Sequence, residues 1–254
     1  MYICNSKNKT MLLTIDVGNS RIKVAVFEYN KKIELCIFET KNALKNFENI
    51  FEKYSNIKKI ILSSVGKLDE DTLNFIKNRF PTEEISHKTK FPFTNLYATP
   101  QTLGIDRMVL AAGATLLYPN KNRLIIDAGT CITYDFVDNK NQYLGGAISP
   151  GIKTRYKSLN DYTAKLPLLE KKEIDYLTGN STENSINSGV INGVCFEIEG
   201  FISQYSLKNQ DLTIILTGGD ADFLAKRLKS TIFANSNFLL ESLNLLSLYI
   251  NEND

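Results

Sequence analysis

Two stretches of the chain place a carboxylate at the end of an apolar strand and a glycine shortly after it. In Leu12–Phe27 (LLTIDVGNSRIKVAVF), an apolar run ends at Asp16, Gly18 marks a turn, and Lys23 lies on an alternating second strand. A carboxylate can bind Mg²⁺, backbone N–H groups of a glycine turn can bind an anion, and a lysine can place its charge beside a phosphate. Taken alone, the stretch is compatible with polyphosphate binding and with an ordinary hairpin.

The same pattern recurs at Asp127, 111 residues after Asp16 (127 − 16). In Leu124–Val137 (LIIDAGTCITYDFV), an apolar strand again ends in an aspartate, and Gly129 precedes a second strand. Since this spacing is too wide for a solenoid repeat, it predicts a duplicated domain whose two loops face one another across a cleft. A third strand, in Ile214–Asp220 (IILTGGD), runs into a double glycine and an acid. Three such corners in one chain favour a ligand site.

A further carboxylate lies where a helix is predicted to begin. Gly104–Arg107 (GIDR) opens a helix predicted to run to Tyr118, and Asp106 suits its N-cap because such a carboxylate accepts backbone N–H groups. Arg107 can bind a carboxylate through two parallel hydrogen bonds. Because a cation is unfavourable in the first turn of a helix, this position favours a binding role over that of a surface arginine.

The regular elements that would position these residues follow in an α/β order. After the first hairpin, the pattern predicts a strand over Ile33–Glu39, a helix over Asn42–Tyr54, a strand over Ile57–Val65 and a helix over Asp69–Phe80. This order is typical of an RNase H-like half. The second half adds a long helix over Gly189–Ser206 and a last helix over Leu239–Ile250. We predict an N-terminal extension (1–10), an N-terminal RNase H-like domain (11–119) and a C-terminal RNase H-like domain (120–254).

Composition narrows the class of protein. The 254 residues are 43% hydrophobic, which suffices for real cores, and the net charge of +2 comes without the basic tract typical of nucleic-acid binding. No run approaches the roughly 20 apolar residues that cross a bilayer, so we expect no membrane segment. Four scattered cysteines without a CxxC motif argue against a zinc site or disulfides and favour a reducing cytoplasm. The single histidine bears on the catalytic group. Because His87 is the only histidine, we expect a carboxylate as general base, which suits phosphoryl transfer.

Five motifs together resemble the type III pantothenate kinases, within the superfamily of actin-like, sugar-kinase and heat-shock-protein ATPases. They are Asp16–Lys23 (DVGNSRIK), Gly104–Arg107 (GIDR), Asp127–Thr130 (DAGT), Gly145–Gly151 (GGAISPG) and Thr163–Pro167 (TAKLP), in the family's order. The resemblance implies two similar RNase H-like (actin-like ATPase) domains, with mixed sheets flanked by helices and the nucleotide in the cleft between them. It also implies ATP-dependent phosphorylation of pantothenate, the first step of coenzyme A biosynthesis. We expect Gly145–Gly151 to form a tight turn near a ligand or the facing domain, or a plain hairpin connection.

The resemblance further assigns roles to single residues. Asp106 would be the general base, a role compatible with a helix N-terminus, and Asp106→Asn should keep the cap and lose the base. The residues implied for pantothenate are Tyr97, Gly104, Ile105, Asp106, Arg107 and Thr182. Those implied for ATP are Asp16, Val17, Gly18, Asn19, Ser20, Arg21, Ile22, Lys23 and Thr130. Asp16 would also bind Mg²⁺, and Asp127 a monovalent cation (K⁺ or NH₄⁺), in a homodimer with the pantothenate pocket near the subunit interface.

Two positions depart from the family's pattern. Ser20 replaces a commoner threonine and keeps the hydroxyl, whereas Thr182 stands in Ser-Thr-Glu-Asn instead of Asn-Thr-Val-Glu. Two alternatives to a pantothenate kinase stay open. One is a non-catalytic regulatory relative that binds a nucleotide or an acyl metabolite, against which the intact acids argue. The other is a sister kinase that acts on another small acid or sugar.

Overall fold

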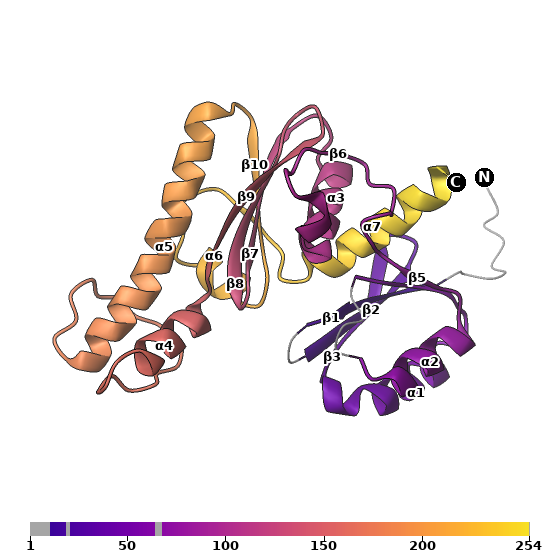
Figure 1. Cartoon of the computed structure of the whole chain (residues 1–254), viewed down its shortest axis with the longest axis horizontal. Helices are drawn as coiled ribbons and strands as arrows, with labels where there is room; N and C mark the ends of the chain where they lie inside the picture. Colours follow the sequence, from indigo (N-terminus) through magenta and orange to yellow (C-terminus); the bar gives the residue numbers. More distant parts are fainter. Residues whose placement is uncertain (1–10, 19–20, 64–67, 254) are drawn as a thin grey trace, which may run out of the picture. The chain divides into compact units, whose positions relative to one another are not determined.

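The chain forms two compact units. The computed structural model describes residues 11–18, 21–63 and 68–253, so the predicted extension (1–10) and the predicted nucleotide contacts Asn19 and Ser20 lie outside the described residues. Unit 1 comprises Met1–Pro92, Thr99–Leu116 and Leu239–Asp254, and unit 2 comprises Phe93–Ala98 and Leu117–Phe238. Figure 1 draws the elements of each. The predicted domains divide at residues 119 and 120, and the units differ from that division mainly in the C-terminal helix, which belongs to unit 1.

Unit 1 is built on a five-stranded mixed sheet in the order β3-β2-β1-β4-β5. Its strands are β1 (Met11–Val17), β2 (Arg21–Glu28), β3 (Lys31–Glu39), β4 (Ile57–Leu62) and β5 (Thr82–Glu84). The first three strands pair antiparallel, and β4 and β5 continue parallel to β1. Its helical elements are η1 (Thr40–Asn42), α1 (Ala43–Lys53), α2 (Glu70–Arg79), η2 (Pro100–Thr102), α3 (Ile105–Leu117) and α7 (Phe238–Asn253).

The helices α1 and α2 form where local sequence favours them. Ala43, Phe47, Ile50 and Phe51 of α1 recur at helical spacing and are buried in one cluster with residues of β1 and β2. The α2 helix begins after Asp69, whose carboxylate accepts the backbone N–H of Thr72 at 2.8 Å. Both predicted helices are confirmed, because each observed end lies one residue inside the predicted one.

The α3 and α7 helices pack closely within unit 1. A Cβ atom added to Gly113 of α3 would lie 2.0 Å from the Ser242 Oγ of α7, so the glycine permits this approach. Polar contacts also tie α7 to the sheet. Lys32 of β3 forms an ion pair of 2.9 Å with Glu241, and Lys59 of β4 donates to Asn251 at 3.0 Å. The last predicted helix thus packs against the sheet of unit 1.

Unit 2 is built on a six-stranded mixed sheet in the order β11-β10-β7-β8-β9-β6. Its strands are β6 (Thr94–Asn95), β7 (Asn122–Ala128), β8 (Cys131–Val137), β9 (Gln142–Pro150), β10 (Leu212–Thr217) and β11 (Phe233–Ala234). Its helices are α4 (Ile152–Asp161), α5 (Thr182–Lys208) and α6 (Ala221–Ala225). The first residue of α5 is Thr182, so this helix begins seven residues (189 − 182) before the predicted start at Gly189. It packs against one face of the sheet through a single apolar cluster that also includes residues of α4 and α6 (Figure 1).

The two sheets repeat one topology. The order β9-β8-β7-β10-β11 in unit 2 matches β3-β2-β1-β4-β5 in unit 1, with the same antiparallel and parallel pairings. The first strands, Met11–Val17 and Asn122–Ala128, have equal length and start 111 residues apart (122 − 11). The predicted α/β fold class, with two mixed sheets flanked by helices, is therefore confirmed, and both sheets repeat the predicted hairpin.

The expectation of a tight turn over Gly145–Gly151 is wrong, because this segment continues strand β9 up to Pro150. Its glycines instead admit close backbone contacts. A Cβ atom at Gly146 would lie 1.5 Å from the Tyr134 carbonyl oxygen, and one at Gly151 would lie 2.0 Å from the Gly129 carbonyl oxygen. Gly145 has a φ of +100°, which disfavours other residues. The glycines of this segment therefore allow β9 to pack closely against β8, and the start of α4 to pack closely against the turn after β7.

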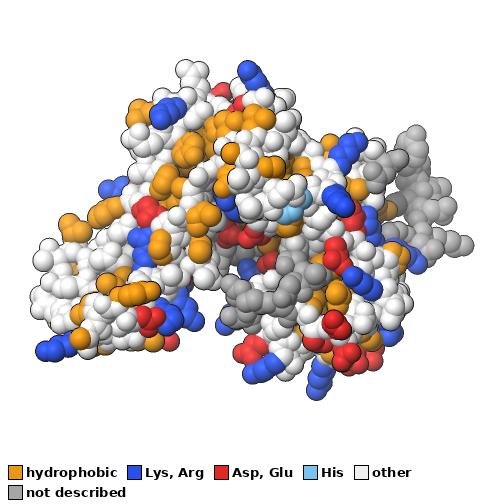
Figure 2. Space-filling view, in the orientation of Figure 1, with side chains coloured by type: hydrophobic (Ala, Val, Ile, Leu, Met, Phe, Trp, Pro, Cys, Tyr) orange, Lys and Arg blue, Asp and Glu red, His pale blue; other side chains and the backbone are white. Residues whose placement is uncertain are grey.

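Among the described residues, no helix combines the length and the apolar character needed to cross a membrane. On the face drawn in Figure 2, Lys and Arg side chains are interspersed with Asp and Glu side chains. Charges of both signs thus share the described part of this face.

We predict that Gly113→Ala destabilises the protein. The new methyl group would lie 2.0 Å from the Oγ and 2.8 Å from the Cα of Ser242. Overpacking of this kind costs about 1–3 kcal/mol, which outweighs the roughly 1 kcal/mol that alanine gains over glycine in a helix. We expect urea denaturation to show a free energy of unfolding lower by about 1–2 kcal/mol. The double variant with Ser242→Gly lacks the two closest atoms, so it should recover part of the lost free energy of unfolding. A double variant as unstable as Gly113→Ala alone would contradict the contact.

Candidate active site

The first part of the site is the hairpin of β1 and β2. Asp16 pairs directly with Lys23 in the antiparallel register, so both side chains leave the same face of the sheet. Their neighbours Val17 and Ile22 are buried in the core on the opposite face. The N–H of Gly18 donates to the carbonyl of Arg21 at 3.0 Å and closes the turn. The alternating pattern thus holds a carboxylate opposite an ammonium group, as predicted.

Two further residues of unit 1 act on Asp16. Ser63, directly after β4, donates its hydroxyl to Asp16 Oδ1 at 3.3 Å, and its own N–H donates to the carbonyl of Ile15 at 3.2 Å. Burial raises the pKa of Asp16 most strongly, and the charge of Asp106 adds to the rise, whereas Lys23 and the Ser63 hydrogen bond oppose it. The structure therefore brings Asp16, Lys23 and Asp106 together. Ser63 was missed, although it is the first polar residue after the apolar run of β4.

Asp106 lies at the N-terminus of α3, but it does not precede the helix as an N-cap would. It is the second helical residue, and its carboxylate Oδ1 accepts the N–H of Arg107 at 2.8 Å. The backbone contact that was expected of a cap is thus made from inside the first turn. The Asp106 side chain is exposed, whereas Arg107 is only 6% exposed. A cation buried in a first helical turn is unusual, which adds weight to a binding role for Arg107.

The second hairpin places Asp127 under a glycine loop. Asp127 is the penultimate residue of β7, and it pairs with Thr133 of β8 and with Thr217 of β10. Gly218, with a φ of +95°, lies so close that a Cβ atom would be 2.4 Å from both Asp127 Oδ1 and the Ala128 carbonyl oxygen. The N–H of Asp220 donates to that same carbonyl at 3.0 Å. The third predicted corner therefore folds onto the second one within unit 2.

Three of the remaining predicted residues come from three other places in unit 2. Thr130 is exposed in the turn between β7 and β8, and Tyr97 lies beside β9, where a Cβ atom at Gly145 would be 3.1 Å from its ring. Thr182 is exposed at the start of α5, after Ser181, whose hydroxyl accepts the N–H of Asn184 at 3.2 Å. Ser181 is the N-cap, so the polar stretch around Thr182 is a helix start.

The donor atoms fit the ions that the resemblance implies. Among the described residues, no three His, Cys, Asp or Glu side chains gather in a group that could hold a metal ion. Mg²⁺ commonly takes one or two carboxylates and completes its shell with water and phosphate oxygens, so Asp16 alone suits it. Asp127 stands beside the Ala128 carbonyl, and both offer hard oxygen atoms that suit an alkali cation. Such oxygens do not distinguish K⁺ from another monovalent ion.

Sequence comparisons give one consistent family. The family model for type III pantothenate kinase matches residues 12–204 of this chain. A type III pantothenate kinase from Flavobacterium psychrophilum is 59% identical over 239 residues, which cover 94% of this chain and 99% of the relative. One from Flavobacterium johnsoniae is 53% identical over 244 residues, which cover 96% of this chain and 100% of the relative. The similarity therefore extends over both units.

Solved structures support the fold alone. A Campylobacter jejuni protein assigned to the Baf family of transcriptional activators has a TM-score of 0.58 at 21% identity, covering 95% of this chain and 100% of that chain. A Listeria monocytogenes protein assigned as an N-acetylmannosamine kinase has a TM-score of 0.53 at 11% identity, covering 96% and 100%. The predicted likeness to the sugar-kinase fold is thus confirmed.

We predict opposite effects of two substitutions on the ionisation of Asp16. In the ligand-free wild type, its carboxyl group should titrate above the ordinary aspartate range, because burial dominates. Lys23→Met removes a cation and should raise the pKa further, whereas Asp106→Asn removes an anion and should lower it. An NMR titration of the Asp16 carboxyl carbon measures both, with Asp16→Asn identifying the signal. Shifts of the same sign in both variants would contradict this electrostatic grouping.

Proposed function

The chain belongs to the type III pantothenate kinase family, and we propose that the residues described above carry out the family's reaction here. That reaction transfers the terminal phosphoryl group of ATP to pantothenate and is the first step of coenzyme A biosynthesis. The observation that carries the residue assignment is the grouping of Asp16, Lys23 and Asp106 in unit 1. One acid with a lysine suits a metal-bound polyphosphate, and a second, exposed acid suits an acceptor hydroxyl.

We assign Asp106 as the general base. Its exposed carboxylate is oriented by the N–H of Arg107, and the helix N-terminus holds it in one place. As the pantothenate hydroxyl oxygen bonds to the terminal phosphorus, the bond between that phosphorus and the ADP oxygen breaks, and the hydroxyl proton passes to Asp106. Because phosphoryl transfer depends strongly on positioning, Asp106 orients the hydroxyl as well as accepting its proton.

The pantothenate carboxylate is assigned to Arg107, whose guanidinium can bind it through two hydrogen bonds. Burial of Arg107 supports this role, since an ion pair between a guanidinium and a carboxylate is stronger where water is largely excluded. Tyr97, Gly104, Ile105 and Thr182 are proposed as the other pantothenate contacts. Their placements support the proposal to different degrees, because Gly104 and Ile105 adjoin Asp106 directly, whereas Tyr97 and Thr182 belong to unit 2.

The nucleotide is assigned to the first hairpin and Thr130. The N–H of Gly18 is already bound to the Arg21 carbonyl, so the side chains of Arg21 and Lys23, with Asn19 and Ser20, are the proposed phosphate contacts. Val17 and Ile22 then act only through the backbone, because their side chains are buried in the core. Asp16 would hold Mg²⁺, which neutralises phosphate charge when bound. Thr130 would contact phosphate, and Asp127 would hold K⁺ or NH₄⁺.

We also propose a homodimer formed through the outer face of α5. Between Asn184 and Leu207 this helix carries two charged residues, Glu197 and Glu199, and both are hydrogen-bonded within unit 2. On its outer side, Gly189, Gly193 and Gly200 leave open space where a Cβ atom would be, and the Phe196 side chain is 63% exposed. A neutral face with a large exposed aromatic residue suits a second copy of the helix.

We propose the cytoplasm as the place of action. Cys36, Cys131 and Cys195, the three cysteines that the structure describes, are free thiols. A reducing compartment preserves such thiols, and one of them, Cys131, is exposed.

Turnover of purified protein tests the function. We expect ADP release that depends on pantothenate with ATP, Mg²⁺ and K⁺, and far slower release with a panel of sugars and other small acids. Asp106→Asn should lower kcat by about 10²- to 10⁴-fold, the usual contribution of a general base, with a smaller effect on KM. The matched control Asp71→Asn changes an exposed acid in the first turn of α2 and should leave kcat unchanged. Full activity of Asp106→Asn would remove Asp106 as the base, and a sugar preference would favour the sister-kinase alternative.

Light scattering tests the dimer. The wild type should have about twice the mass of one chain, and Phe196→Glu should shift the mass toward that of a monomer, because two like charges would meet across the two-fold axis. The control Tyr162→Glu replaces another exposed aromatic residue of unit 2, which is 88% exposed, and should stay dimeric. A monomeric wild type, or a dimeric Phe196→Glu, would contradict the proposed interface.

A further inference from the structure

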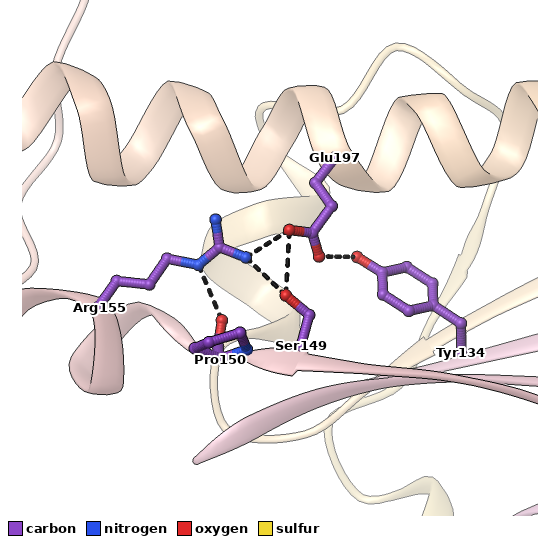
Figure 3. A network of polar contacts seen from close by, with 5 residues as sticks. All are labelled: Tyr134, Ser149, Pro150, Arg155 and Glu197. Carbon is purple, nitrogen blue, oxygen red and sulfur yellow. Dashed lines mark hydrogen bonds and ion pairs between the residues drawn. The ribbon is translucent and has the colours of Figure 1, made fainter. Parts of the chain in front are cut away.

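A cluster of polar side chains joins α5 to the end of β9 and the start of α4 (Figure 3). At its centre is Glu197, whose side chain is 24% exposed and whose carboxylate accepts three hydrogen bonds. Tyr134 donates to Oε1 at 2.8 Å, Ser149 donates to Oε2 at 3.0 Å, and Arg155 donates to Oε2 at 2.5 Å. Three donors on one carboxylate fix both the rotamer of Glu197 and the position of its partners.

Arg155 connects the cluster to the backbone of β9. Its Nη2 donates both to Glu197 and to the Ser149 hydroxyl, the latter at 2.8 Å, and its Nε donates to the Pro150 carbonyl at 2.8 Å. Arg155 lies in the first turn of α4, where the helix dipole disfavours a cation, and Glu197 compensates for this cost. The guanidinium thus clamps the last two residues of β9 against α5.

The clamped segment in turn holds the turn between β7 and β8. Gly151 follows Pro150 directly, and its N–H donates to the Thr130 carbonyl at 3.0 Å. The Thr154 hydroxyl donates to the same carbonyl at 2.6 Å. A Cβ atom at Gly151 would lie 2.0 Å from the Gly129 carbonyl oxygen, so this contact leaves no room for a larger residue. The backbone of Thr130 is therefore set by the start of α4.

The charge state of the cluster is well defined. Burial alone would raise the pKa of Glu197, yet the hydrogen bonds from Arg155, Tyr134 and Ser149 outweigh it and hold the pKa below its ordinary value. Burial and the bond to Glu197 raise the pKa of Tyr134, which therefore stays protonated as a donor. At neutral pH the cluster consists of a carboxylate, a guanidinium and two hydroxyl groups.

We propose that Arg155 and Glu197 are positioning residues for Thr130, so that α5 sets the place of the turn which contacts the nucleotide phosphates. The inference rests on the proposed function in one respect, namely that Thr130 contacts phosphate. Neither Arg155 nor Glu197 needs to touch a substrate. A merely structural role would lower thermal stability and leave the ratio of the two substrate KM values unchanged.

Two conservative variants test the proposal. Glu197→Gln keeps the shape and removes the charge, and Arg155→Lys keeps the charge but cannot donate to Pro150, Ser149 and Glu197 from one planar group. We expect each to raise KM for ATP about tenfold, since displacement of a positioning group costs up to about 10²-fold, while KM for pantothenate changes less than about twofold. Combined, they should cost no more than the larger single effect, because they act through one pair.

The matched control is Asp161→Asn, which breaks the exposed 2.6 Å ion pair between Asp161 and Lys157 on the same helix and should change neither KM. Hydrogen exchange of the Gly151 amide gives a readout that needs no substrate, and it should become faster in Glu197→Gln and in Arg155→Lys. Exchange as slow as in the wild type, or equal rises in both KM values, would overturn the positioning role. Thr130→Ala separates the two proposals: if it leaves KM for ATP unchanged, the phosphate role of Thr130 fails, whereas the Gly151 exchange still decides whether the cluster holds the turn.

Discussion

The register of the β1–β2 hairpin is the constraint on which the chemistry of unit 1 depends. Val17 and Ile22 must be buried, and because side chains alternate along a strand, Asp16 and Lys23 then face each other on the opposite side. A shift of the strand register by one residue would bury the charged side chains and expose the apolar ones, which would be strongly destabilising. The hydrophobic burial that stabilises unit 1 therefore also fixes the distance between the acid and its lysine.

Unit 2 uses the same register for a different local chemistry. Its turn is one residue shorter, since three residues separate Ala128 from Ile132 where four separate Val17 from Ile22, and a neutral Thr133 faces Asp127. The carboxylate of Asp127 instead has the Ala128 carbonyl and the Gly218 backbone beside it. One topology thus provides an acid beside an ammonium group in the first copy and an acid near a backbone carbonyl in the second. This divergence suits a metal-bound polyphosphate in one unit and a simple cation in the other.

Local sequence patterns allowed much of the fold to be predicted, whereas contacts between residues far apart in the sequence could not be predicted. The repeat of Asp16 at Asp127, and the α1 and α2 helices, follow from spacing alone. Ser63 reaches Asp16 across 47 residues, and Arg155 reaches Glu197 across 42, so no local signal announces either contact. The Gly145–Gly151 segment was misjudged because a glycine that permits a turn and one that permits close packing look alike in a single sequence. The roles of Tyr97 and Thr182 depend on bound pantothenate and stay predictions.

The binding of Mn²⁺–ATP to the wild type and to Asp16→Asn, followed by electron paramagnetic resonance, tests the central claim most directly, because Mn²⁺ shares the oxygen preference of Mg²⁺. We predict that the wild type immobilises the Mn²⁺ signal in a ternary complex with ATP. Asp16→Asn should weaken that complex by at least about 10- to 100-fold, which is the loss that mutation of an outer-shell partner alone causes. Equal affinity of the two proteins for Mn²⁺–ATP would contradict the assignment of the first hairpin to the metal-bound nucleotide.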